Sequence, residues 1–350
     1  MKDSSTDMRL SVAPMMDCTD RHFRYLVRLI SHRVRLYTEM VAASALVYGA
    51  RHGRDPMRFL AHRPEEHPLA LQLGGSDPAI MAEAARMGAD AGFDEINLNI
   101  GCPSDRVTSG RFGACLMAEP QVVAACVHAI RDALVGAARQ IPVTVKTRIG
   151  IDHHDSDAFL DDFVGQVSAA GCDTFVIHAR KAWLTGLSPK ENRDIPPLRY
   201  ERVYRLKRAF PALTVIINGG ITTLDAATAH LAHVDGVMIG RAAYGAPYAL
   251  LADADRRLYG KAYAVPSESE IAQRYLDYAA REVQTGTRLH LVTRHATGLL
   301  SGRPGARAWR RALSQVNIAP GPATALKSLL TLIARNNNRD SVALAEALAA

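Results

Sequence analysis

The sequence is organised around residues 95–103, which read Glu95-Ile96-Asn97-Leu98-Asn99-Ile100-Gly101-Cys102-Pro103. Apolar side chains alternate here with Asn97 and Asn99, which is the period of a β-strand. The glycine permits backbone angles that other residues resist, and the proline ends strand pairing. The pattern predicts a strand that holds Cys102 in a tight turn just beyond its carboxyl end. Taken alone, such a thiol is either a small buried hydrophobe or a reactive group.

Short apolar runs of the same kind recur along the first 240 residues. Eight strands are expected, at residues 10–13, 36–38, 69–73, 95–99, 143–147, 174–178, 214–218 and 236–239. Helical composition is found at residues 21–31, 78–91, 120–137, 155–170 and 224–233. Strands that alternate with helices form parallel sheets, and eight such units close into a (β/α)8 TIM barrel. We therefore expect an α/β protein built on this barrel.

From about residue 263 the pattern changes to helices without intervening strands. Ser267 and Glu270 have the spacing of a capping box. Helices are expected at residues 269–283, 291–300, 306–312 and 323–334, and a short last helix follows the asparagines at 336–338. The chain is therefore expected to have a polar tail at 1–8, a catalytic barrel at 9–262 and an all-α domain at 263–350.

The charge of the chain, +7 in total, is concentrated in the expected helical domain. Residues 281–311 contain seven arginines and a single acid, Glu282. Such a cluster is typical of a surface that binds a phosphate backbone, although a solvated basic face is the alternative. The charge pattern favours a nucleic-acid partner.

Five cysteines in no paired spacing argue against both a disulfide framework and a zinc site, and we expect no metal. The chain has no apolar run long enough to span a bilayer, and its polar start does not resemble a signal peptide. These features predict a cytoplasmic protein that does not enter the membrane.

Six of the expected strands end in a polar side chain or a glycine. These ends are Gln72–Gly74, Asn97–Asn99, Lys146–Arg148, His178–Arg180, Asn218–Gly220 and Gly240–Arg241. The carboxyl ends of all barrel strands face one rim, which is where barrel enzymes have their active sites. Glycines after the seventh and eighth strands are typical of phosphate binding, so the rim predicts a phosphorylated cofactor.

Lys146 ends the fifth expected strand, beside the barrel centre. A fixed positive charge near the pyrimidine edge of a flavin stabilises the anionic reduced ring. Gln72 is suited to the same edge, and His178 to a ring contact or to donation as a neutral imidazole. At this point a salt bridge for Lys146 and a structural role for His178 remain open.

These residues resemble the tRNA-dihydrouridine synthase family over about residues 10–314. The segments that match are residues 13–16, 97–106, 110–114, 145–150, 178–180, 218–220 and 240–241. Ser109 departs from the asparagine that is usual in the family, so we leave it out of the site. Residues 179–193 resemble the subgroup that acts on positions 20 and 20a of the tRNA D-loop.

The resemblance implies an FMN enzyme that reduces the C5–C6 double bond of uridine in tRNA with NADPH as electron donor. A hydride from flavin N5 would go to C6, and Cys102 would donate a proton to C5, a role that suits a thiol because thiols are mostly protonated at neutral pH. The implied flavin contacts are Pro14, Met15, Met16, Gln72, Lys146, His178, Asn218, Gly219, Gly220, Gly240 and Arg241. The expected tRNA contacts are Asn99, Arg148, Arg180, Lys181 and Thr185 at the barrel and Arg294, His295, Arg303, Arg307, Arg310 and Arg311 in the helical domain.

The expected partner is tRNA, without DNA or membrane, and the protein is expected to be a monomer. One alternative is a flavin barrel enzyme acting on a small free pyrimidine, as dihydroorotate dehydrogenases do, but the basic helical domain would then have no role. Another is an RNA-binding protein that has lost catalysis. The intact Cys102, Lys146 and rim glycines count against that second alternative.

Overall fold

The computed structural model describes residues 7–104, 110–136, 140–261, 263–317 and 321–333. The chain divides into two compact units. The first joins Met1–Thr19 to Val34–Gly240, and the second joins Asp20–Arg33 to Arg241–Ala350. Contacts thus group residues 20–33 and 241–261 with the helical segments that follow, and the expected division at residues 262 and 263 stays a prediction. No helix in the described part of the chain is long and apolar enough to cross a membrane.

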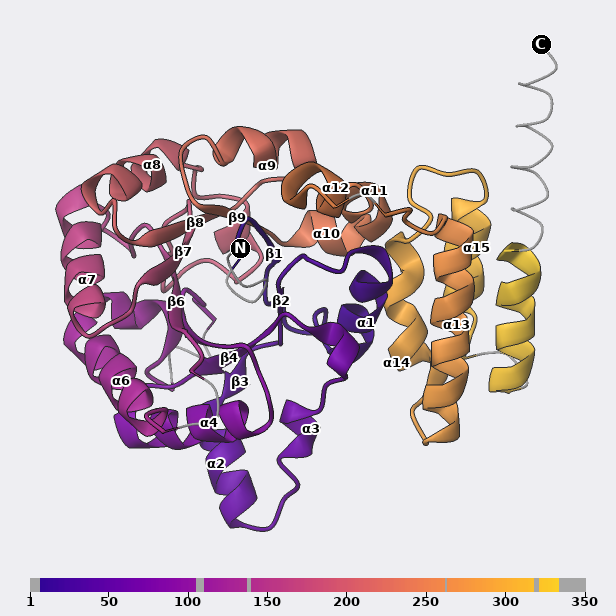
Figure 1. The fold of residues 1–350 in the computed structure, drawn as a ribbon, viewed down its shortest axis with the longest axis horizontal. Helices are drawn as coiled ribbons and strands as arrows, with labels where there is room; N and C mark the ends of the chain where they lie inside the picture. The colour runs from indigo at the N-terminus through magenta and orange to yellow at the C-terminus, as the bar shows by residue number, and fades with distance from the viewer. Residues whose placement is uncertain (1–6, 105–109, 137–139, 262, 318–320, 334–350) are drawn as a thin grey trace. The chain divides into compact units, whose positions relative to one another are not determined.

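The first unit is a barrel of parallel strands surrounded by helices (Figure 1). Its strands are β1 (Leu10–Val12), β2 (Leu36–Tyr37), β4 (Leu69–Gly74), β5 (Glu95–Ile100), β6 (Val143–Arg148), β7 (Thr174–His178), β8 (Thr214–Asn218) and β9 (Gly236–Ile239), in the order β1-β9-β8-β7-β6-β5-β4-β2. The ring closes because Val12 N donates to Arg35 O at 2.9 Å and Arg35 N donates to Leu10 O at 3.1 Å. All eight expected strands are confirmed, and a short β3 (Val41–Ala42) that we did not expect pairs with β4.

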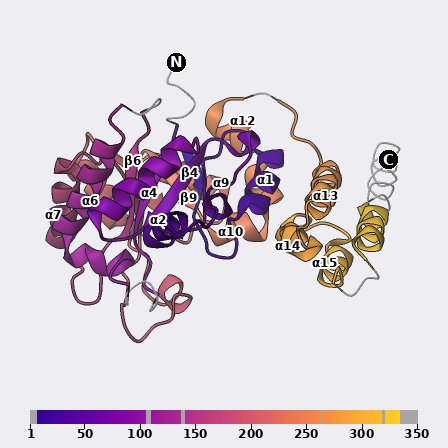
Figure 2. The ribbon, with the colours of Figure 1, turned by 90° about the horizontal axis from the view of Figure 1, so that it is seen from below.

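The helices of the first unit begin at a side-chain cap in three cases, at Asp77, Ser156 and Thr223. The helices of this unit are α2 (Ala43–Arg51), α3 (Met57–Leu60), α4 (Pro78–Asp90), α6 (Pro120–Ala133), α7 (Asp157–Ala169), α8 (Tyr200–Ala209) and α9 (Leu224–His230). The helix expected from residue 155 starts two residues later because the Ser156 hydroxyl caps it by accepting from Phe159 N at 3.1 Å. Figures 1 and 2 show α4, α6 and α7 side by side outside the strands.

The two faces of β5 have different environments. Ile96 points outward, where α4 packs so closely that a Cβ on Gly88 would lie 3.0 Å from Ile96 and 2.6 Å from Leu71. Asn97 points into the barrel, donating to Thr144 of β6 and accepting from Gln72 of β4. Other interior residues form an apolar cluster, among them Ala70, Val176, Ile216 and Met238. One side of the barrel interior is therefore polar and leads toward the rim.

The second unit is helical in the part of the chain that the structure describes. It contains α1 (Arg21–Ile30), α10 (Arg241–Gly245), α11 (Pro247–Leu251), α12 (Ala254–Tyr259), α13 (Glu268–Gln284), α14 (Leu289–Thr293), α15 (Ala306–Ser314) and helical residues 322–333. The predicted capping box at Ser267 and Glu270 is confirmed. Most of the expected tail and the short last helix lie outside the described residues.

The helix predicted over 291–300 is wrong, because α14 ends at Thr293 and a 3₁₀ turn, Arg294–Gly298, follows. Two contacts explain the change. The Ala296 carbonyl accepts from Trp309 Nε1 at 2.8 Å, and Gly298 lies so close to Gly245 that a Cβ would come within 2.3 Å of its carbonyl oxygen. Tertiary packing therefore overrides the local helical pattern.

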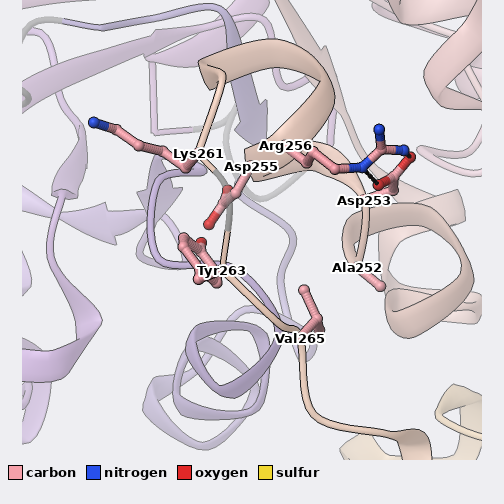
Figure 3. A pocket seen from close by; sticks show the side chains of 7 residues that line it. All are labelled: Ala252, Asp253, Asp255, Arg256, Lys261, Tyr263 and Val265. Atoms are coloured by element: carbon pink, nitrogen blue, oxygen red, sulfur yellow. Dashed lines mark hydrogen bonds and ion pairs between the residues drawn. The ribbon is translucent and has the colours of Figure 1, made fainter.

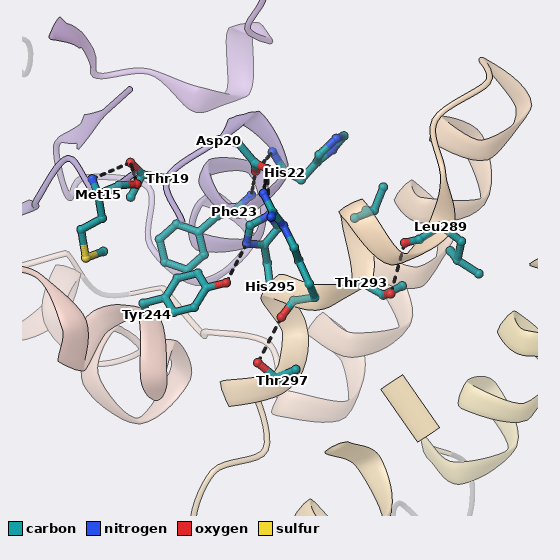
Figure 4. Close-up of polar contacts among 12 residues, drawn as sticks. Met15, Thr19, Asp20, His22, Phe23, Tyr244, Leu289, Thr293, His295 and Thr297 are labelled. Carbon is teal, nitrogen blue, oxygen red and sulfur yellow. Dashed lines mark hydrogen bonds and ion pairs between the residues drawn. The ribbon is translucent and has the colours of Figure 1, made fainter. Parts of the chain in front are cut away.

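Asp20 joins two segments of the second unit that are far apart in sequence (Figure 4). Its carboxylate caps α1 by accepting from His22 N at 2.9 Å and Phe23 N at 3.1 Å. The same group accepts from His295 Nε2 at 2.9 Å and from Arg294 Nη2 at 2.8 Å. Although burial opposes the ionised form, the two basic partners hold the pKa of Asp20 well below its usual range. Asp20 is therefore a charged anchor between α1 and the 3₁₀ turn.

Asp20→Asn should lower the free energy of unfolding by about 2 kcal/mol near neutral pH, because it weakens the cap and removes the charge. The folded pKa lies below the unfolded one, so the stabilisation is present above the ordinary aspartate pKa and is lost as pH falls below it. Urea denaturation at about pH 7 and about pH 3 measures this difference. Asp77→Asn is the control, since Asp77 caps α4 and has no ion pair among the described residues. A difference from wild type that does not shrink in acid would contradict the assignment.

Candidate active site

The polar strand ends meet at one rim of the barrel. In register, Asn99 lies opposite Lys146, and His178 lies between Arg148 and Asn218 on the neighbouring strands. Lys146 Nζ donates to Asn218 Oδ1 at 3.3 Å, which links β6 to β8 across the mouth of the barrel. Parallel strands thus bring together side chains that are far apart in the sequence.

Cys102 follows β5 in a turn whose backbone is held on both sides. Asn99 Oδ1 accepts from Gly101 N at 3.1 Å and from Cys102 N at 3.0 Å. On the carbonyl side, Thr147 Oγ1 donates to Ile100 O at 3.1 Å. The thiol is partly exposed, and its Sγ lies 3.4 Å from Ser104 Oγ. The turn therefore presents an accessible thiol on a fixed backbone.

Gly101 does not have the role that the sequence suggested. It is not among the glycines with a positive φ, and a Cβ on it would meet Lys146 and Thr147 at an ordinary 3.5 Å. The prediction of a special backbone angle at this glycine is therefore wrong, because side-chain hydrogen bonds hold the turn instead.

Arg148 is buried and its guanidinium binds three backbone carbonyls. Nε donates to Gly101 O at 2.9 Å, and Nη1 donates to Lys181 O and Asn192 O at 3.0 Å each. Burial lowers the pKa of Arg148 to about 10, which still leaves it charged at neutral pH. Arg148 therefore fastens the Cys102 turn to the segment at 181–193, and we leave it out of the proposed tRNA contacts.

The segment after β7 is held by contacts with residues 152–155 and by a contact of its own Trp183. Lys181 Nζ donates to Asp152 O at 2.8 Å, lies 3.2 Å from a carboxylate oxygen of Asp155 and lies 4.3 Å from the centroid of the Trp183 ring. The Asp152 carboxylate accepts from Leu184 N at 2.8 Å. Residues 152–155 thus support the neighbouring segment. Within the described ranges, no three His, Cys, Asp or Glu side chains gather as potential metal ligands.

Two other expected contacts of this segment differ in availability. Arg180 is partly buried and its guanidinium donates to Pro196 O and, at 3.4 Å, to Asp194 O. Thr185 is exposed. The segment therefore offers Thr185 to a ligand more directly than it offers Arg180 or Lys181.

Lys146 has no carboxylate within ion-pair distance among the residues that the structure describes, which removes the salt-bridge alternative for it. Burial, and then the charge of Arg148, lower the pKa of Lys146 to about 8. Burial, followed by Arg148 and Lys146, also lowers the pKa of His178 well below its ordinary value. His178 is therefore a neutral imidazole at neutral pH, and the rim is a positive site suited to an anion.

The two glycines after β8 have positive φ angles. Gly219 has φ 117° and Gly220 has φ 67°, and a Cβ on Gly219 would lie 2.6 Å from the His178 ring. Tyr200 fixes the turn by donating to Gly219 O at 2.7 Å. Gly240 follows β9 and would place a Cβ no closer than 3.6 Å to its neighbours, Ala13 and Met15. Side chains of His178 and Leu198 fill the space beside Gly219 and Gly220, which explains why neither position carries a side chain, whereas the backbone at Gly240 is open to close approach.

The remaining expected flavin contacts lie at chain positions next to this rim. Pro14 and Met15 are partly exposed after β1, and Met16 is 56% exposed. Arg241 directly follows Gly240, is exposed and begins α10 of the second unit.

The expected tRNA contacts of the second unit fall into two groups. His295 is fully buried, with Nε2 bound to Asp20 and Nδ1 lying 3.2 Å from Tyr244 Oη, so we exclude it from a binding surface. Arg294 and Arg303 pair with Asp20 and Glu268, respectively, although Arg303 remains 60% exposed. Arg307, Arg310 and Arg311 of α15 are exposed and have no ion pair within the described part of the chain.

A small pocket in the second unit has a volume of about 280 Å³ (Figure 3). Its acidic lining is already satisfied, since Asp253 pairs with Arg256 at 2.7 Å and Asp255 accepts from Ser31 Oγ at 2.6 Å and His32 N at 2.7 Å. The pocket therefore offers no acidic group that requires a ligand, and Lys261 is the remaining charged residue of its lining.

Our sequence reasoning missed the buried residues that support the rim. Glu95 and Thr144 lie inside the barrel below Asn99 and Lys146, and Asn192 is fully buried as the centre of the segment after β7. The alternation of Glu95, Asn97 and Asn99 in β5 was a usable signal, because both faces of a barrel strand are covered and a polar inner face is unusual.

The family model and three relatives that match this chain carry the name dihydrouridine synthase. The family model described as dihydrouridine synthase matches residues 11–334. A tRNA-dihydrouridine(20/20a) synthase of Shewanella oneidensis is 56% identical over 309 residues, 88% of this chain and 89% of that protein. The proteins of the same name from Synechocystis sp. and Escherichia coli K12 are 57% identical over 305 residues and 56% over 308 residues, covering 87% and 88% of this chain and 88% and 86% of their own lengths.

Lys146→Met should raise the free energy of unfolding by about 1 kcal/mol near neutral pH, because the folded protein holds this ammonium at a lowered pKa. The sign follows from linkage: the wild type gains stability as pH rises from about 8 toward the unfolded lysine value, so the advantage of the variant shrinks over that interval. Urea denaturation at several pH values measures it, with exposed Lys190→Met as control. A variant less stable than wild type near pH 7 would contradict the electrostatic interpretation.

Proposed function

The chain belongs to the dihydrouridine synthase family, and we propose that it is the enzyme that reduces uridines 20 and 20a of the tRNA D-loop to dihydrouridine. The observation that carries the proposal is the rim itself, where an accessible Cys102 on a fixed turn stands beside an uncompensated lysine, Lys146, and a neutral imidazole, His178. The relatives, which are 56% or 57% identical to this chain over the aligned residues, support the choice of positions 20 and 20a.

FMN is the cofactor that we propose for the rim. Lys146 and His178 provide N–H donors, which suit the oxygen and nitrogen acceptors along the pyrimidine edge of a flavin. Gln72 and Asn218 are further proposed contacts, each with an amide N–H already bonded inside the barrel, to Asn97 Oδ1 and to Met238 O. Gly240 leaves its backbone open to a phosphate, Gly219 and Gly220 are the further backbone contacts that we propose, and Pro14, Met15, Met16 and Arg241 complete the proposed contacts. When bound, the flavin supplies the hydride that uracil C6 receives, and NADPH returns the two electrons.

Cys102 completes the reduction as a general acid. Reduction of the C5–C6 bond needs one hydride and one proton, and a thiol beside the base donates the proton to C5. The resulting thiolate lies next to Lys146 and Arg148, and solvent returns its proton. Asn99 holds the backbone of the turn while the proton moves.

Binding of tRNA uses the basic surface of the second unit. The exposed arginines Arg307, Arg310 and Arg311 on α15 suit phosphate contacts, and Arg303 and Arg294 contribute from positions that also pair with acids. The target base must leave its stack to reach the rim, where Thr185, Arg180 and Lys181 would meet the RNA. A tRNA substrate implies the cytoplasm, and we propose a monomer without a DNA or membrane partner.

The alternative of a free pyrimidine substrate is separated from this proposal by substrate choice. Purified protein with FMN and NADPH is mixed with unmodified tRNA, with uridine or with orotate, and NADPH oxidation and dihydrouridine are followed. Reduction of tRNA alone is expected. Reduction of only the free bases would overturn the proposal, and a colourless protein that binds tRNA would favour an RNA-binding role.

Cys102→Ala should retain bound flavin and tRNA affinity but reduce tRNA at least about a hundredfold more slowly, because only the proton donor is removed. Single-turnover formation of dihydrouridine measures the rate, and the flavin absorbance measures occupancy. Cys115→Ala is the matched control, since Cys115 is also partly exposed but donates to Phe112 O. Wild-type rates in Cys102→Ala would remove this thiol from the mechanism.

Arg307→Ala combined with Arg310→Ala should weaken tRNA binding and reduce the salt dependence of the affinity by about one to two ions in the log–log slope. Filter binding at several salt concentrations measures the slope. The control is Arg51→Ala combined with Arg86→Ala, which removes the same charge from exposed, acid-paired positions of the first unit. If both double variants bind with the same slope as the wild type, the α15 arginines do not contact tRNA.

A further inference from the structure

A row of polar side chains runs inside the barrel from Glu95 to the turn after β5. Its links are Thr144 Oγ1 to Glu95 Oε1 at 2.5 Å, Asn97 Nδ2 to Thr144 Oγ1 at 2.7 Å, Gln72 Nε2 to Asn97 Oδ1 at 2.7 Å and Asn99 Nδ2 to Gln72 Oε1 at 2.8 Å. We call these five side chains the polar chain. Glu95, Asn97 and Thr144 are 0% exposed, so water does not compete for their hydrogen bonds.

Glu95 sets the direction of the polar chain. Its carboxylate accepts from Arg35 Nη1 at 3.1 Å and from the Tyr37 hydroxyl at 3.0 Å as well as from Thr144. Burial, and then the charge of Glu95, raise the pKa of Tyr37 well above its ordinary value, so the phenol keeps its proton and donates. Thr144 has one hydroxyl proton, and the hydroxyl donates it in a hydrogen bond to Glu95.

The remaining links follow from the inventory of donors and acceptors. Because the Thr144 proton is used, its oxygen must accept, and Asn97 therefore turns its NH2 toward Thr144 and its oxygen toward Gln72. The same requirement orients Gln72 and then Asn99. Reversing any one amide would place two donors or two acceptors face to face in a buried site, which is costly.

The last member of the polar chain acts on the reactive turn. With its NH2 bound to Gln72, Asn99 presents Oδ1 to the N–H groups of Gly101 and Cys102. A reversed Asn99 amide would present donors to those two donors and could not hold the turn. The position of the thiol thus depends on a carboxylate four side chains away.

We propose that Glu95 is a positioning residue for Cys102, acting through Thr144, Asn97, Gln72 and Asn99. The inference rests on the proposed function in one respect, since it takes Cys102 as the proton donor. Glu95 touches neither substrate nor cofactor in this proposal. Its effect is to fix the orientation of each amide in the polar chain, and so the backbone of the turn.

Thr144→Val tests the proposal, because it keeps the shape of the side chain and breaks the link to Glu95. Its rate of dihydrouridine formation should fall about tenfold at equal flavin occupancy, while KM for tRNA changes less than about twofold. Thr144→Ser restores the hydroxyl and should recover most of the rate. Thr174→Val is the control, since it removes another buried strand hydroxyl, which bonds to Asp173 outside the polar chain.

Alkylation of the thiol provides a readout that does not need tRNA. Iodoacetamide should modify Cys102 of Thr144→Val at least about threefold faster than in Thr144→Ser, with Cys18 as internal reference, because the turn is released. Equal alkylation and equal rates in the valine and serine variants would overturn the proposal. A wild type that modifies no tRNA would instead refute the proposed function and leave the alkylation result to decide the positioning role.

A measurement on the wild type covers the case in which Thr144→Val does not fold. The side-chain amide protons of Asn97 and Gln72 should exchange with solvent at least about a hundredfold more slowly than those of exposed Gln121. Exchange as fast as that of Gln121 would show that the buried links do not persist, and would overturn the proposal.

Discussion

The barrel depends on Arg35, whose backbone and side chain act at the same place. Its N–H and carbonyl close the ring between β1 and β2, and its guanidinium pairs at 3.1 Å with Glu95 inside the barrel. Both side chains are 0% exposed, so desolvation offsets much of their attraction, whereas removal of either partner would leave a buried charge at a cost of about 3–5 kcal/mol. The pair therefore does less to add stability than to fix which strands and which polar atoms face each other.

Unlike the paired charges of Arg35 and Glu95, the charges at the rim are all positive. Lys146, Arg148 and a neutral His178 meet where the strands end, and burial lowers the pKa of each of them. Hydrogen bonds from Arg148 to three backbone carbonyls offset part of the free energy lost by burying its charge. The same bonds join the Cys102 turn to the segment after β7. Lys146 has only the Asn218 amide within the described residues, so its charge is available to an anionic ligand. Stability is thus given up at the position where chemistry is proposed.

The second unit shows that residues in one basic cluster have different tasks. Asp20 uses His295 and Arg294 to anchor α1, and Trp309 is buried with its indole N–H bound to Ala296 O. The exposed arginines of α15 lie on the same short helix as that buried tryptophan. The core of the unit therefore holds the helix in place, and its outer face carries the charge that a phosphate backbone would meet.

The sequence by itself determined the strands, the barrel and the rim, because period-two alternation and polar strand ends are local patterns that parallel topology brings together. It also placed Cys102 after β5. Only the tertiary structure decided which polar residues are available to a ligand. In the sequence, Arg148 and His295 cannot be distinguished from solvent-exposed basic residues, yet each is buried and bound to a partner remote in the chain. The oriented links from Glu95 to Asn99 join three strands, so no local pattern specifies them. The direction of a hydrogen bond depends on which donor faces which acceptor, and these groups face each other only once the strands have packed into the barrel.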